Sequence, residues 1–137
     1  MATNGILTRK LAYLQEQLSV LRSWRLGSLK EYSENQLLQR AVERQLQVCV
    51  EIVIDICERI LAARKLPPAD TSADNLHEVA KLGLIARVED YTDMIRFRNF
   101  LVHRYESVET EIVYDIVKNK LDTLDRFLSE ISAATEN

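Results

Sequence analysis

One ten-residue stretch, residues 96–105, brings together three arginines, a histidine and three aromatic residues in the order RFRNFLVHRY. Nowhere else in the chain do a titratable imidazole, several cations and aromatic side chains coincide. An imidazole titrates near pH ~6.5 and can take or give a proton at neutral pH. Arginine can bind two phosphate oxygens at once. These residue types are the minimum for metal-free RNA cleavage, in which a 2′-hydroxyl attacks the adjacent phosphorus.

In this interpretation His103 acts as base or acid, and Arg98 stabilises the charge that develops on the phosphoryl oxygens. A structural interpretation stays open, in which His103 is a buried, hydrogen-bonded residue at a helix end and Arg98 forms an ion pair. Side chains five positions apart on a helix diverge by about 140°, whereas Asn99 shares a face with His103. Convergence of Arg98 and His103 therefore requires an unwound helix end, the reach of arginine or a second subunit. We favour a two-fold dimer.

Composition excludes several other function classes. The net charge of -3 argues against a generic nucleic-acid coat, so any RNA contact must come from a local patch. Dinucleotide, P-loop, serine-hydrolase and zinc-protease motifs are absent. His77 follows Asp74 by three positions, but no E-x-x-H motif occurs, so we expect it at the surface and expect no metal or cofactor. Cys49 and Cys57 are expected to be buried, reduced thiols.

The elements that must position these residues are helices. With 3 Gly and 2 Pro, the chain has too few turn residues for an all-β fold. Five segments carry helical periodicity. They are expected at about residues 7–27, 34–65 with a capping box from Ser33 to Gln36, 71–83, 85–103, and from a cap at Ser107 to a frayed tail after residue 132.

This pattern predicts an all-α fold, an antiparallel four-helix-type bundle with one additional short helix. We expect a single domain over residues 1–137 with an ordered core at about 5–132. The amino terminus lacks the apolar core of a signal peptide and no apolar run could span a membrane, so we expect a cytoplasmic protein. Asp55 interrupts an apolar stretch. It is interpreted either as solvent-facing or as a carboxylate directed at a core arginine or a subunit contact.

The segment RNFLVHRY, Arg98 to Tyr105, resembles the signature of the HepT-like toxins, which are HEPN-domain proteins. That signature is an arginine, four residues, a histidine, one residue and a tyrosine, and every position matches. The resemblance extends over roughly residues 6–131. It includes RKL at residues 9–11, AVERQLQVCVEIVIDI at residues 41–56 and the E-x-E-I-V-Y run at residues 109–114.

The resemblance implies a homodimeric, metal-independent ribonuclease toxin paired with a minimal nucleotidyltransferase antitoxin. Arg98 and His103 map onto the catalytic pair, and Tyr105 maps onto the tyrosine to which the antitoxin adds AMP from ATP. Each AMP would place an anion beside a site that receives anionic RNA. Asn99, Arg96 and Arg104 are expected in supporting roles.

The expected substrate is tRNA or mRNA, with no DNA or membrane partner. The alternative is a non-catalytic HEPN module that presents a nucleotide or RNA to a partner nucleotidyltransferase.

Overall fold

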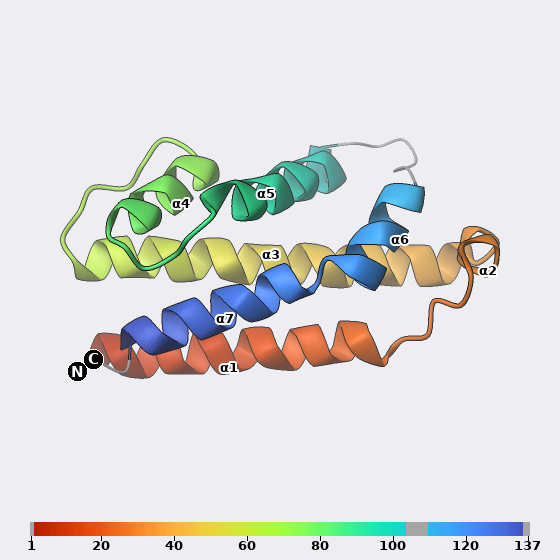
Figure 1. Ribbon diagram of the computed structural model, residues 1–137, viewed down its shortest axis with the longest axis horizontal. Coiled ribbons are helices and arrows are strands. Elements are labelled where there is room, and N and C mark those ends of the chain that lie inside the picture. The colour runs from red at the N-terminus through yellow and green to blue at the C-terminus, as the bar shows by residue number, and fades with distance from the viewer. Residues whose placement is uncertain (1, 104–109, 136–137) are drawn as a thin grey trace.

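The computed structural model describes residues 2–103 and 110–135, and this part of the chain contains helices and no strand (Figure 1). The helices are α1 (Ala2–Ser23), α2 (Leu29–Ser33), α3 (Gln36–Ala63), α4 (Ser72–Lys81), α5 (Val88–His103), α6 (Thr110–Asn119) and α7 (Asp122–Thr135). The predicted all-α fold is confirmed.

The longest helix, α3, forms the centre of the bundle. Helices α1, α4 and α5 all pack on α3, and α7 packs on α1. In Figure 1, α1 and α7 lie on one side of α3 and α4 and α5 on the other. The five leucines that recur along α1 are each at most 7% exposed, so the predicted stripe is the buried face of that helix. Helix α5, which carries residues 98–103 of the candidate motif, thus packs against the central helix α3 and against α4.

Two predicted helix boundaries are wrong at the turn between α1 and α3. Helix α1 ends at Ser23 rather than near Gly27, and the chain then forms the short helix α2. The capping box belongs to α2, since the Ser28 hydroxyl accepts from Glu31 N and the Glu31 carboxylate accepts from Ser28 N. Helix α3 instead takes Asn35 as its N-cap. The run from Ser28 to Glu31 fits the same capping-box pattern as the predicted box from Ser33 to Gln36, so the pattern alone does not distinguish the two.

The predicted fifth helix is two helices. Helix α6 ends at Asn119 and α7 begins at Asp122, with buried Leu121 between them. Helix α6 packs on α2 and α3, whereas α7 packs on α1, and Figure 1 shows the two at different inclinations. The apolar stripe continues through the break, which is why periodicity alone suggested one helix. The predicted cap at Ser107 lies outside the described residues.

Cys49 and Cys57 are confirmed as buried free thiols on α3. Burial raises the pKa of Cys49 to about 11 and that of Cys57 to about 12, because the core disfavours a thiolate. Both side chains therefore stay neutral at physiological pH and serve as small core residues.

Arg126 of α7 fixes the start of α5. Its guanidinium donates to Asp90 Oδ2 at 2.9 Å and to the Tyr91 hydroxyl at 3.0 Å, and it also reaches the carbonyls of Ala86 and Arg87 at 3.3 Å. Glu130, one turn further along α7, accepts from Ala86 N at 2.7 Å and from the Tyr91 hydroxyl. These contacts hold residues 86 and 87 outside the helix, so α5 begins at Val88 and not near residue 85 as predicted.

Replacing Arg126 with alanine should lower the free energy of unfolding by about 2–3 kcal/mol. The change removes several hydrogen bonds donated by a side chain that is only 22% exposed. It also leaves the carboxylates of Asp90 and Glu130 without their cationic partner. Urea denaturation measures the loss. Arg22→Ala is the matched control: its bidentate pair with Asp125 also involves α7, but both side chains are over 40% exposed, so we expect at most about 1 kcal/mol. Equal losses would contradict this account.

Asp55 lies between Lys10 of α1, at 2.9 Å, and Arg59 of α3, at 3.2 Å, with its side chain 36% exposed. It is therefore partly solvent-facing and paired, and its arginine partner lies on its own helix at the surface rather than in the core. Burial raises the pKa of Asp55, but the hydrogen bonds from Lys10 and Arg59 outweigh this effect and hold the pKa below its usual value.

Asp55→Asn should therefore destabilise the protein by about 0.5 kcal/mol at pH 7, since solvent screens this pair. The pKa of Asp55 is lower in the folded chain than in the unfolded chain, where it is about 3.9. The ionised carboxylate therefore stabilises the fold above about pH 3.9, and this stabilisation disappears as the pH falls through the folded-state pKa. The difference between wild type and variant should become smaller as the pH falls from 7 to 3. Urea midpoints measured from pH 7 down to pH 3 test this, and a difference that stays constant would contradict it.

Candidate active site

Arg98 is half-buried on α5 and faces the beginning of α4. Its Nη2 donates a long hydrogen bond of 3.5 Å to the Ser72 hydroxyl, and its Nε is buried with no partner among the described residues. Ser72 is the first residue of α4, whose N-cap is Thr71: the Thr71 hydroxyl accepts from Asp74 N at 3.1 Å. The Arg98–Ser72 contact joins residues 26 positions apart, so no local signal could have indicated it.

Arg98 differs from the other half-buried arginine of the described chain, Arg126. Arg126 is neutralised by two carboxylates and further saturated by a hydroxyl and carbonyls. Arg98 forms no ion pair with any described residue, so the ion pair of the structural interpretation is not found there. A partly desolvated guanidinium without a carboxylate is unfavourable unless an anion joins it. Arg98 is therefore suited to receive an anionic group.

The neighbouring candidate residues on α5 are exposed. Arg96 pairs with Asp93, one turn earlier, at 2.8 Å, with side chains 77% and 66% exposed. Asn99, which directly follows Arg98 in the chain, is also exposed. Arg96 is two positions from Arg98 and points elsewhere, so the structure does not bring these two cations together.

Helix α5 continues without a break from Arg98 to its last residue, His103. This excludes an unwound stretch between them, so convergence needs the reach of arginine or a second copy of the chain. The His103 side chain, and the whole of Arg104 and Tyr105, lie outside the described residues. The pairing of Arg98 with His103 therefore stays a prediction.

No group of three or more histidine, cysteine or acidic residues suited to a metal ion occurs in residues 2–103 and 110–135. His77 is exposed on α4, as predicted. None of the helices in the same ranges is long and apolar enough to cross a membrane.

Comparisons with known proteins agree with this architecture. The family model described as "Ribonuclease HepT-like" matches residues 14–131. An mRNA nuclease HepT from Shewanella oneidensis is 26% identical over 132 residues, which cover 95% of this chain and 98% of the relative.

Two solved structures are also similar. A toxin–antitoxin structure with AMP-PNP contains a chain with a TM-score of 0.85 and 25% identity, covering 94% of this chain and 98% of that one. A tri-AMPylated Shewanella oneidensis HEPN toxin in complex with an MNT antitoxin gives a TM-score of 0.84 and 26% identity, covering 93% and 97%.

Proposed function

Because the chain belongs to the HepT-like ribonuclease family, we propose that it is a ribonuclease toxin neutralised by a nucleotidyltransferase antitoxin. The match spans most of the chain, and the relative named as an mRNA nuclease covers nearly all of it. Messenger RNA is therefore the first substrate to test, with tRNA second. The similar toxin that was solved with an MNT antitoxin supports a partner of that kind.

Arg98 and His103 form the proposed catalytic pair. Neutral His103 takes the proton of a ribose 2′-hydroxyl, whose oxygen forms a bond to the adjacent phosphorus. The bond from phosphorus to the 5′-oxygen breaks, and that oxygen takes up a proton. Arg98 stabilises the charge on the phosphoryl oxygens. The observation that carries this proposal is the half-buried Arg98 guanidinium, which has no carboxylate partner among the described residues.

The active unit in this proposal is a homodimer. Arg98 and His103 diverge on one continuous helix, so a second copy can supply the missing half of each site. Val102, within the motif, and Ile112, seven residues after it, are apolar side chains 37% and 44% exposed. Apolar surface of this kind suits burial against a second copy.

Tyr105 is the proposed site of AMPylation. It lies two residues after His103, so an adenylyl group on its hydroxyl adds a bulky anion next to the bound phosphate. Repulsion and steric exclusion then block RNA. Co-expression with the nucleotidyltransferase should add the mass of one or more adenylyl groups and remove growth inhibition. An unmodified protein that is equally harmless alone would contradict the toxin assignment.

A further inference from the structure

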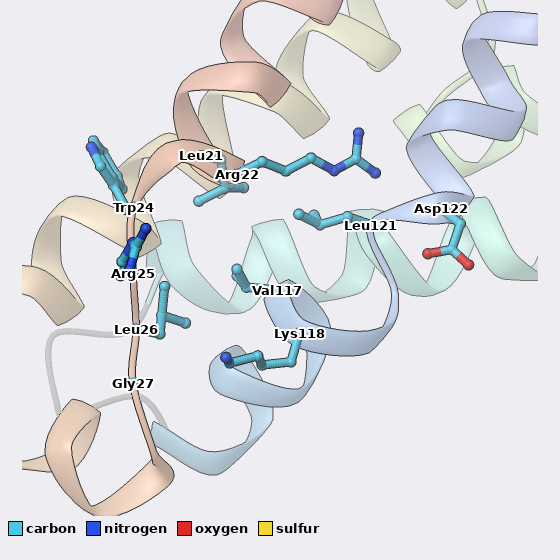
Figure 2. A pocket seen from close by; sticks show the side chains of 10 residues that line it. All are labelled: Leu21, Arg22, Trp24, Arg25, Leu26, Gly27, Val117, Lys118, Leu121 and Asp122. Carbon is cyan, nitrogen blue, oxygen red and sulfur yellow. The ribbon is translucent and has the colours of Figure 1, made fainter.

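A pocket of about 550 Å³ lies between the linker that follows α1 and the α6–α7 turn, outside the candidate active site. Figure 2 shows the linker residues Trp24 to Gly27 on one side and Lys118 of α6 extending towards them. The Tyr114 hydroxyl donates to the Gly27 carbonyl at 2.7 Å and fixes the linker to α6. The pocket is thus formed in the folded chain, and its size suits a small-molecule or nucleotide unit of ~300–1,000 Å³.

Two cations of this pocket have no acidic partner within residues 2–103 and 110–135. Arg22 is bound to Asp125 by a bidentate pair, and Asp122 also lies on the Arg22 side of the pocket in Figure 2. Neither Arg25 nor Lys118 forms an ion pair with a described residue, and the Lys118 ammonium lies 5.6 Å from the centre of the Tyr114 ring. The end of the pocket formed by Arg25 and Lys118 is therefore positive in a chain whose net charge is -3.

An aromatic ring accompanies these cations. Trp24 packs partly buried against the core, so its ring is held in place beside Arg25. Leu21, Leu26 and Leu121 supply apolar lining. One cation beside an indole and a second across the pocket match a phosphate and its neighbouring base, since bases stack on aromatic rings while phosphates bind lysine and arginine. An acidic peptide would use the cations but would not need the indole.

Lys118 of this pocket lies on α6, the described helix that follows the candidate catalytic motif in the chain. Helix α6 begins at Thr110, seven residues after His103, and Lys118 is eight residues further along it, about 12 Å at ~1.5 Å per residue. We propose that this pocket is an accessory subsite for single-stranded RNA, in which Arg25 and Lys118 bind a phosphate and Trp24 stacks on a base. The inference rests on the proposed function.

Trp24 is the chain's one tryptophan, so its fluorescence reports directly on this pocket. The full chain is titrated with a single-stranded, eight-nucleotide 2′-O-methyl RNA, which lacks the attacking hydroxyl and stays uncut. We expect quenching of Trp24 and a dissociation constant that rises with salt. Arg25→Ala combined with Lys118→Ala should weaken binding about tenfold or more and reduce the logarithmic salt slope by about 0.7, the value for one phosphate contact on a single strand.

The control combines Arg9→Ala with Arg64→Ala, which removes two exposed cations that form no ion pair with a described residue. Arg9 lies in the first half of α1 and Arg64 directly after α3, at the end of the bundle opposite to the pocket, so binding should stay within about twofold. Anisotropy of a dye-labelled copy of the same RNA measures total binding. Binding without Trp24 quenching, or equal weakening in both double variants, would overturn the subsite. The subsite would also be overturned if AMP alone, or a polyglutamate peptide, quenched Trp24 with the same dissociation constant as the RNA. Cleavage of ordinary RNA by the same preparation tests the proposed function separately.

Discussion

Arg98→Ala is expected to lower the rate of RNA cleavage at least about 100-fold and to abolish growth inhibition, because it removes the cation that stabilises the phosphoryl charge in the transition state. Its folding free energy should change by less than about 1 kcal/mol, since Arg98 has one long hydrogen bond and no ion pair among the described residues. Cleavage of labelled mRNA, together with urea denaturation, measures both effects. His103→Ala should show the same loss of activity.

Arg96→Ala is the matched control for Arg98→Ala. Arg96 lies on the same helix, but it is exposed and paired with Asp93, so its loss should change the cleavage rate by no more than a few-fold. Arg98→Lys keeps the charge but loses the forked geometry and should restore only part of the activity. Full activity of a folded Arg98→Ala protein would remove Arg98 from the mechanism.

Tyr105→Phe should separate toxicity from neutralisation. Phenylalanine keeps the ring but lacks the hydroxyl that accepts AMP, so the variant should cleave RNA at close to the wild-type rate. In the presence of the nucleotidyltransferase and ATP it should stay active while wild type is inhibited about 100-fold or more, because the added anions repel and exclude RNA. Intact-mass spectra and RNA cleavage, measured before and after incubation with the antitoxin, give both results.

Tyr13→Phe provides the control for Tyr105→Phe. Tyr13 is 46% exposed on α1, so it is accessible but lies outside the motif. A Tyr13→Phe protein should still be modified and inhibited like wild type. If Tyr105→Phe were modified and inhibited as efficiently as Tyr13→Phe, Tyr105 would not be the acceptor.

The sequence predicted the core of this fold because its signals are local and redundant. The leucine stripe of α1 and the apolar face of α3 repeat at helical spacing, and Pro67 follows the end of α3. The errors fall where two local signals compete or where side chains distant in sequence decide the outcome. Ser28 and Ser33 both carried capping patterns, and the start of α5 depends on Arg126, some 40 residues away.

The candidate site was only partly predictable for the same reason. Residue types alone placed Arg98 in a group with Arg96, whereas the structure pairs Arg96 with Asp93 and leaves Arg98 against α4. The basic pocket beside α6 could not be predicted, since Arg25 and Lys118 are more than 90 positions apart and carry no motif.

The chemistry of the RNA ends tests the central claim most directly. Purified, unmodified protein is incubated with a defined mRNA fragment in EDTA, and the products are analysed by mass spectrometry. Attack by the 2′-hydroxyl predicts 2′,3′-cyclic phosphate and 5′-hydroxyl ends, formed by wild type and lost in Arg98→Ala and His103→Ala. Products with 3′-hydroxyl and 5′-phosphate ends, or cleavage only after a divalent metal is added, would contradict the account. RNA that is bound but left intact would favour the non-catalytic HEPN module instead.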